Sequence, residues 1–211
     1  MKTHPLDYSS LLYTSTDKYL NLDMDGATQL PEIRDGITDV WVRGLNGPLT
    51  GIPSSVKTLT VVECLGFLNL ERLPEGLTTL RLIECPDYID LGTVGKNVSS
   101  LMVFGCPDVD YRDIIDQLDH FSLEASGFAS NVISDILGAG CREVDLYDPD
   151  NGVALELGAA VNIRALSVDC AIGTISLEIK SLPECLETLD ISGPGSFSVS
   201  IPEMTSEPKV N

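Results

Sequence analysis

The cysteines are the first residues in the sequence whose type and spacing could do chemistry. The chain has six of them: Cys64, Cys85, Cys106, Cys141, Cys170 and Cys185. Such a set could form disulfides, ligate a metal or stay reduced in a core. A zinc site is disfavoured, because zinc ligands come in close pairs and the sequence has no Cys-x-x-Cys pair. The first three follow one another at intervals of 21 residues, which instead indicates a structural repeat.

Two acidic segments could offer oxygen ligands to a cation. Residues 21–32 read Asn-x-Asp-x-Asp-Gly-x5-Glu, which is close to the calcium loop of an EF-hand. Pro31 lies where the exit helix of that motif would begin, and prolines stop helices. We therefore interpret this segment as a strand followed by an acidic turn. Residues 148–152, Asp-Pro-Asp-Asn-Gly, are typical of a turn, and we predict no metal site.

The sequence also gives little support for catalysis. A nucleophile needs a base within reach, and the only histidine inside the chain is His120, beside Phe121. The acids are numerous in a chain of net charge −19, so they single out no catalytic pair. We predict a protein that is not an enzyme and that needs no cofactor.

The repeat has the frame Leu-x-x-Leu-x-Leu-x-x-Cys over residues 77–85, and the same frame occupies residues 56–64 and 98–106. It continues less strictly in both directions, which makes about nine copies between residues 17 and 195. Alternating apolar residues predict a short strand with one face buried, and the cysteine that follows fits a small buried apolar position. The inward pairs are Leu20/Leu22, Val40/Val42, Leu59/Val61, Leu80/Leu82, Leu101/Val103, Phe121/Leu123, Val144/Leu146, Leu166/Val168 and Leu189/Ile191. Cys170 is displaced from the frame by one residue.

The segments between the strands are of two kinds. Leu-Pro or Ile-Pro phrases at 30–31, 52–53, 73–74 and 182–183 favour extended backbone. Residues 110–118 and 130–138 instead combine a capping residue with apolar residues at helical spacing, so they predict short helices.

This frame resembles the leucine-rich repeat, and the proline phrases resemble the short LPxxL-type repeats of effectors from Gram-negative pathogens and irregular repeats in phages. The resemblance implies an α/β fold, a right-handed β-α solenoid with a parallel sheet on its concave face. We divide the chain into an N-terminal cap (1–16), a solenoid (17–201) and a flexible C-terminal tail (202–211). Terminal repeats need a cap because their core would otherwise be open.

Charge and hydropathy exclude several partners. The formal charge of 13 − 32 = −19 opposes phosphate backbones and anionic lipid surfaces. No apolar run approaches the length of a membrane-spanning helix, and the first residues lack the apolar core of a secretory signal. We therefore expect a cytoplasmic, reducing location, with neither nucleic acid nor membrane as a partner.

The residues that flank the inward pairs point out of the sheet and define its solvent-facing surface. The candidate protein-binding residues on this surface are Trp41, Val62, Arg81, Ile83, Met102, Phe104, Glu124, Asp145, Tyr147, Asp169 and Asp190. Val62, Ile83 and Phe104 should form an unbroken apolar ridge, with Trp41, Met102 and the stem of Arg81 beside it. The last five residues give the later repeats a mostly acidic face. Exposed apolar clusters mark interfaces.

We thus predict non-catalytic recognition of a protein partner, one with a basic surface, by the concave face. One alternative is a structural or assembly component of a phage or virus particle. A second alternative is a secreted bacterial effector that acts in a host cell.

Overall fold

The computed structural model of the chain describes residues 17–66, 68, 70, 73–91, 94, 96–111, 113–124, 140–147, 154–156, 162–169, 175–181, 184–193 and 197–200. The chain forms two compact units, Met1–Leu118 and Asp119–Asn211. The expected cap at 1–16, the helix at 130–138, the turn at 148–152 and the tail at 202–211 lie outside the described residues.

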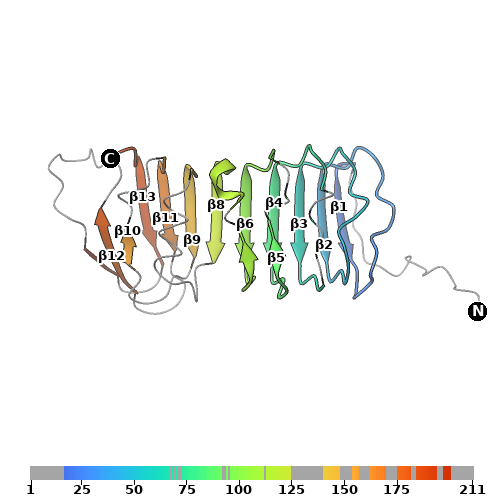
Figure 1. Cartoon of the computed structure of the whole chain (residues 1–211), viewed down its shortest axis with the longest axis horizontal. Coiled ribbons are helices and arrows are strands. Elements are labelled where there is room, and N and C mark those ends of the chain that lie inside the picture. The colour runs from blue at the N-terminus through green and yellow to red at the C-terminus, as the bar shows by residue number, and fades with distance from the viewer. Residues whose placement is uncertain are drawn as a thin grey trace, which may run out of the picture. The chain divides into compact units, whose positions relative to one another are not determined.

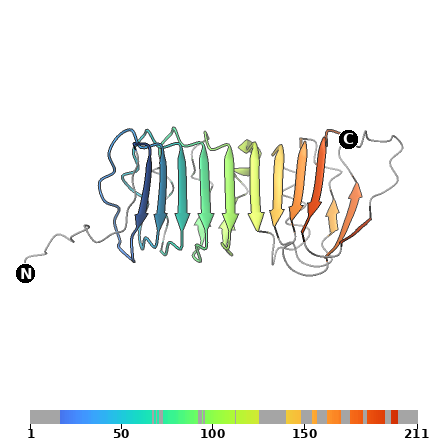
Figure 2. The same cartoon turned by 180° about the vertical axis from the view of Figure 1, so that it is seen from behind.

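The first unit is a series of parallel strands stacked side by side, with one strand of the main sheet in each repeat (Figures 1 and 2). These strands are, in spatial order, β1 (Tyr19–Asp23), β2 (Asp39–Arg43), β3 (Thr58–Val62), β4 (Thr79–Ile83) and β6 (Ser100–Phe104). Two short strands, β5 (Ile89–Asp90) and β7 (Val109–Asp110), pair in parallel in a sheet of their own. This unit is therefore a parallel β-solenoid.

The second unit has the same architecture. Its main strands are β8 (His120–Glu124), β9 (Glu143–Tyr147), β11 (Ala165–Asp169) and β13 (Thr188–Ser192), which pair in parallel in this order. A second parallel sheet contains β10 (Ala154–Glu156), β12 (Ile175–Ser181) and β14 (Phe197–Ser200) in the order β10-β12-β14.

The predicted repeat frame and its register are confirmed. Each of the nine inward pairs lies on one of the main strands, and neighbouring strands align without a shift, as in the series Leu59↔Leu80↔Leu101. Side chains alternate between the two faces of a strand, so the leucines at 80 and 82 are fully buried while Arg81 between them is exposed. The core of each unit is thus a set of apolar columns that run across the strands.

The connections are more extended than the resemblance implies. In the described part of the chain, the only helical structure is a single turn of 3₁₀ helix, Ile115–Gln117, in place of the helix expected at 110–118. Asp110 belongs to β7, and Tyr111, Ile114 and Leu118 are all buried after it. One tight turn is enough to bury this apolar stripe, so no longer helix forms. The β-α superhelix is therefore not seen in the described residues. No helix there is long and apolar enough to cross a membrane.

The proline phrases at 52–53 and 73–74 form turns directly before strands, and the phrase at 182–183 lies outside the described residues. The carbonyl of Pro53 accepts a hydrogen bond from the N–H of Val56 (3.1 Å), and that of Pro74 accepts one from Leu77 (3.0 Å). Val56 and Leu77 are buried at 0% and 1% exposure. These two prolines thus act as turn residues ahead of an inward apolar residue. The sequence predicts extended backbone here, and the structure has tight turns instead.

A left-handed residue follows several strands of the first unit. At this position φ is 67° in Gly44, 48° in Glu63, 52° in Glu84 and 60° in Gly105. Its N–H donates to the last strand residue of the next repeat, for example Glu84 to the carbonyl of Phe104 at 2.7 Å. The left-handed conformation therefore bends the chain off the sheet while one more inter-repeat hydrogen bond forms.

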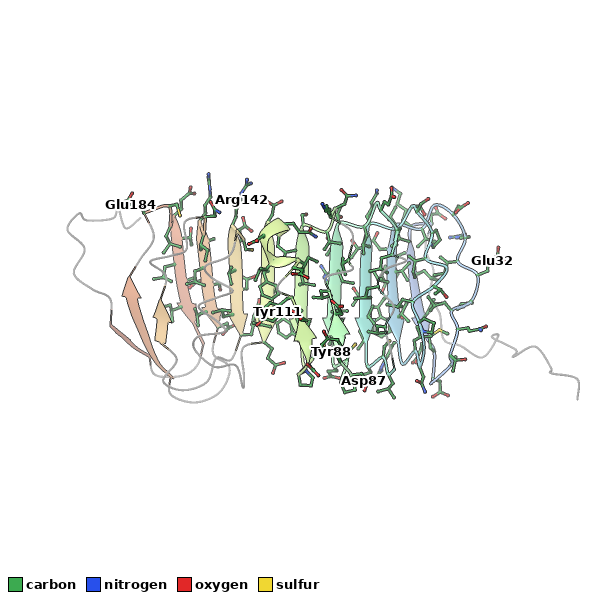
Figure 3. All side chains as sticks on the ribbon, in the orientation of Figure 1. Glu32, Asp87, Tyr88, Tyr111, Arg142 and Glu184 are labelled. Atoms are coloured by element: carbon green, nitrogen blue, oxygen red, sulfur yellow. The ribbon has the colours of Figure 1, made fainter. Side chains whose placement is uncertain are left out.

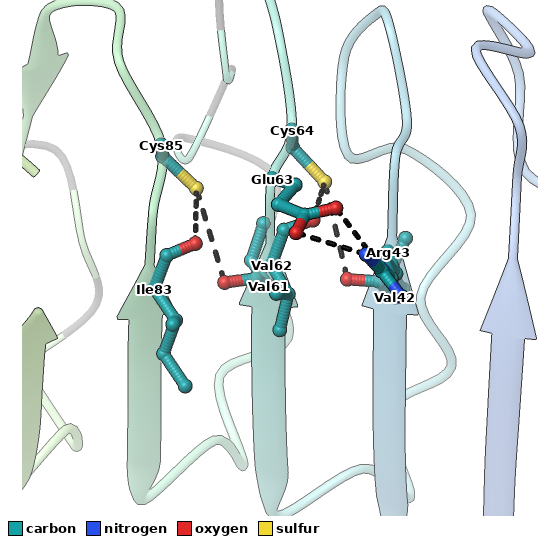
Figure 4. A network of polar contacts seen from close by, with 8 residues as sticks. All are labelled: Val42, Arg43, Val61, Val62, Glu63, Cys64, Ile83 and Cys85. Atoms are coloured by element: carbon teal, nitrogen blue, oxygen red, sulfur yellow. Dashed lines mark hydrogen bonds and ion pairs between the residues drawn. The ribbon is translucent and has the colours of Figure 1, made fainter. Parts of the chain in front are cut away.

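The cysteine of the frame comes directly after this bend, and its thiol turns inward. The thiols of Cys64, Cys85 and Cys106 donate to the carbonyls two residues earlier, at 3.3, 3.4 and 3.2 Å (Figure 4 shows the first two). Burial raises the pKa of Cys64, and likewise that of Cys141, to about 11. The hydrogen bond with Cys85 raises the pKa of Cys106, and burial adds to it. These thiols are free and act as core residues.

Leu80→Ala should lower the free energy of unfolding by ~2–5 kcal/mol, because it empties a fully buried site in the middle of an apolar column. Urea unfolding followed by circular dichroism measures this change. Thr79→Ala, at the adjacent outward position, should stay within roughly ±0.5 kcal/mol of the wild type. Equal losses from the two substitutions would contradict the register, since a shift of one residue exchanges the faces.

Glu84→Gly should raise the free energy of unfolding by ~0.5–1 kcal/mol, because glycine adopts the left-handed conformation without the strain that Cβ causes. Gly105→Ala is the matched opposite change. Its new Cβ would lie 3.1 Å from Cγ of Glu84 at a φ of 60°, so it should cost about 1–2 kcal/mol. Thermal unfolding of both variants checks the signs, and effects in the same direction would contradict the proposed origin of the bend.

Candidate protein-binding face

The structure brings together the outward residues of the first unit as the repeat predicts. One column runs Asn21, Trp41, Thr60, Arg81 and Met102 across adjacent strands. The next column runs Asp23, Arg43, Val62, Ile83 and Phe104. Both columns lie on the face of the strands that points away from the buried leucines and valines. The predicted residues of the apolar ridge are therefore neighbours on one surface.

The exposure of the predicted ridge residues differs from the expectation at Val62. Trp41, Ile83, Met102 and Phe104 are half-buried and Arg81 is exposed, but Val62 is only 9% exposed. Val62 therefore does not contribute to an unbroken exposed ridge as predicted. It lies between Arg43 and Ile83 in the register, and the larger side chains on both sides shield a short valine. Thr60, between Trp41 and Arg81, is shielded in the same way at 7%.

An ion pair that the sequence analysis missed borders this surface (Figure 4). Nε and Nη2 of Arg43 donate to the two carboxylate oxygens of Glu63 at 2.7 and 2.9 Å. The hydrogen bond to Glu63 raises the pKa of Arg43, and the same bond lowers that of Glu63. Both side chains are exposed, so the pair adds little stability. Its effect is to occupy the guanidinium of Arg43 within the chain.

The second unit presents an acidic face, as predicted. Ser122, Asp145, Ser167 and Asp190 form one column, and Glu124, Tyr147, Asp169 and Ser192 form the next. Asp190 is exposed, and the other candidate residues of this unit are half-buried. Burial raises the pKa of Tyr147, and the negative charges of Asp145 and Asp169 raise it further. Asp145, Asp169 and Asp190 lie on neighbouring strands of this face, so their negative charges are close to one another.

His120, Ser122 and Asp145 meet on this face in a cluster that the sequence analysis did not foresee. Nε2 of His120 lies 2.8 Å from Oδ2 of Asp145 and 3.0 Å from Oγ of Ser122. In a Ser-His-Asp triad the carboxylate holds Nδ1, which leaves Nε2 for the serine. Here both partners meet the same ring nitrogen, Ser122 Oγ also donates to Asp145 at 3.1 Å, and Ser122 is only 2% exposed. The cluster thus lacks the geometry of a triad.

Further polar and apolar groups lie at the ends of the strands (Figure 3). Arg142, just before β9, pairs with Asp119 at 3.5 Å, and Arg164, before β11, pairs with Glu187 at 3.3 Å. Among the described residues, three large apolar or aromatic side chains outside the ridge are also exposed: Tyr19 at 39%, Leu65 at 47% and Tyr88 at 49%. Leu65 and Tyr88 follow β3 and β4, where the frame assigns no outward position, so the strand pattern could not reveal them.

The segment with calcium-loop spacing folds as the strand-and-turn interpretation predicts. Asn21 and Asp23 belong to β1, and a turn follows at Asp25 and Gly26. Glu32, which would close a calcium loop, is exposed. Among the described residues, no group of three or more His, Cys, Asp or Glu side chains is arranged to hold a metal ion.

The fold and its repeated outward face define a repeat protein of the parallel β-solenoid class. No family model, no curated protein and no solved structure matches the chain. What the chain does must therefore be argued from its own surface.

Proposed function

We propose that the chain is a non-catalytic protein-binding module of the leucine-rich-repeat type, which binds its partner with the outward, concave face of the sheet. The observation that carries this proposal is the group of large side chains gathered on adjacent strands of the first unit: Trp41, Arg81, Ile83, Met102 and Phe104. Tryptophan, arginine, phenylalanine and methionine are enriched in interfaces, and a few such residues supply most of the binding energy.

The acidic face of the second unit complements this role. Glu124, Asp145, Asp169 and Asp190 attract a partner with a basic surface, and such charges act mainly on the rate of association. The buried, free thiols favour a reducing compartment, because exposure to oxidising conditions would select for disulfides. The net charge of −19 disfavours nucleic acid and anionic membranes as ligands, which supports a protein partner.

The same face would serve a component of a phage or virus particle, or an effector in a host cell, because both roles depend on docking to a protein. Stoichiometry distinguishes the first from recognition: an assembly component co-purifies with particles at a fixed ratio. A role as an enzyme is disfavoured by the His120 cluster, in which the serine is buried and the carboxylate meets Nε2.

Phe104→Ala and Trp41→Ala should each weaken the complex by ~2 kcal/mol or more, because central aromatic anchors dominate interface energies. The partner is first captured on the immobilised chain. Its affinity for each variant is then measured by calorimetric titration. Leu65→Ala is the matched control: it removes an exposed apolar side chain outside the face and should leave affinity unchanged. The proposal is wrong if Leu65→Ala weakens binding while the two aromatic substitutions, still folded by circular dichroism, do not.

Asp145→Asn combined with Asp190→Asn should slow association with the partner and flatten its dependence on salt, with little change in the dissociation rate. Stopped-flow association at several salt concentrations measures this effect. Asp25→Asn together with Asp87→Asn removes the same charge from turn positions in the first unit and serves as the control. Equal slowing by both double substitutions would assign the effect to net charge instead of to the acidic face.

A further inference from the structure

Arg81 occupies the centre of a group of nine outward residues, and none of the other eight is charged. The outward residues of β3, β4 and β6 form a grid of three rows: Thr58, Thr79 and Ser100; Thr60, Arg81 and Met102; and Val62, Ile83 and Phe104. All eight neighbours of Arg81 on this grid are uncharged. This is notable in a chain with 32 acidic and 13 basic residues, in which an acidic neighbour would be the ordinary outcome.

The guanidinium of Arg81 is also available for binding. Arg81 is exposed, and no hydrogen bond or ion pair joins its guanidinium to another residue in the part of the chain that the structure describes. Arg43, on the same face, is occupied by Glu63 through two hydrogen bonds. Arg142 and Arg164 have acidic partners as well. Arg81 is therefore the guanidinium on this face that a partner's carboxylate can bind without displacing an internal one.

We propose that this grid binds an extended segment of the partner protein in which an acidic side chain pairs with Arg81 and a large apolar side chain, two residues away, contacts Ile83 and Phe104. This inference rests on the proposed function and names the partner chemistry at the first unit. Arginine binds a carboxylate through two parallel hydrogen bonds, which fixes geometry as well as charge.

The spacing of the grid supports an extended segment. Residues i and i+2 of a strand are ~6.6 Å apart on one face, and Arg81 and Ile83 have this relation. A partner backbone in the same conformation has the same repeat, so an acid placed over Arg81 brings the next outward side chain over the row of Ile83 and Phe104. The hydroxyl groups of Thr79 and Ser100, which are half-buried in the first row of the grid, offer hydrogen bonds on the other side of the acid.

The charge pattern also sets the selectivity of this site. A segment with several acids would be repelled by the net charge of −19, so we expect one acid among apolar neighbours. A phosphate backbone would meet the same repulsion with one arginine to offset it. The acid thus fixes the position of the segment on the grid, and the apolar contact supplies much of the affinity.

The test is a selection from a displayed library of random 12-residue peptides on the whole chain, on the Arg81→Gln variant and on Arg164→Gln as a control. Arg164 is an exposed arginine of the second unit, so its substitution changes net charge equally. Peptides selected by the wild type should be enriched in Asp or Glu with a large apolar residue two positions away. The Arg164→Gln pool should match the wild-type pool, and the Arg81→Gln pool should lose the acid.

One enriched peptide is then synthesised and titrated by fluorescence anisotropy. Replacing its acid by the amide, or using the Arg81→Gln variant, should weaken binding by about tenfold or more, while Arg164→Gln should have almost no effect. Circular dichroism and thermal unfolding verify that both variants fold. The inference is overturned if no peptide is enriched over an unrelated protein, if the selected peptides lack an acid, or if Arg81→Gln selects the same sequences.

These outcomes separate the inference from the proposed function. Selected peptides whose binding depends on Phe104 but not on Arg81 would reject the carboxylate and leave the binding face in place. Peptides that are insensitive to both Phe104→Ala and Arg81→Gln would contradict the binding face as well.

Discussion

The stacking of inward apolar side chains in register across adjacent parallel strands is the constraint on which the rest of the structure depends. A single repeat buries nothing alone, because its two inward residues need the equivalent pair of the next repeat against them. The leucine and valine columns of the first unit satisfy this need almost completely, with Val42, Leu59, Val61, Leu80 and Leu82 all at 0% exposure. Register cannot slip, since a shift of one residue would turn every inward side chain outward.

The same constraint determines the chemistry of the outer face. When the inward residues align, the outward residues between them align too. The outward residues at one position of the repeat therefore form a column across the surface. In the first unit these columns collect large apolar side chains around Arg81, and in the second unit they collect acids and the cluster at His120. The left-handed residue after the strand has a similar role at the edge: it places Glu63 beside Arg43 while its backbone completes the ladder.

The strands and their register could be predicted from the sequence because both follow from a local, repeated signal. Alternation over three residues is enough to place each strand, and equal spacing aligns them. The exposure of Val62 and Thr60 could not be predicted in this way, since it depends on the lengths of side chains on neighbouring strands, about 20 residues away in sequence. The Arg43–Glu63 pair and the meeting of His120 with Asp145 are non-local for the same reason, with separations of 20 and 25 residues.

The helix expected at 110–118 shows a different limit. Its apolar spacing is real, and Tyr111, Ile114 and Leu118 are indeed buried, but the pattern does not say how many residues precede the turn. The pairing of Asp110 with Asp90 takes the start of the segment into β7, and the remaining residues suffice for one 3₁₀ turn. Whether residues 110–118 begin as a strand or as a helix depends on the neighbouring repeat. That repeat lies outside the nine residues from which the helix was predicted.

In this repeat fold, the residues that stabilise the structure are not the residues that face outward. The inward columns supply the apolar burial, and the inter-repeat ladder uses backbone groups that do not depend on side-chain identity. Outward residues such as Arg81 can therefore change from one strand to the next without disturbing either. An arginine with eight uncharged neighbours is not required by the stacking of the solenoid. The role that we propose for it, pairing with a carboxylate of a partner, therefore uses a residue that the fold itself does not need.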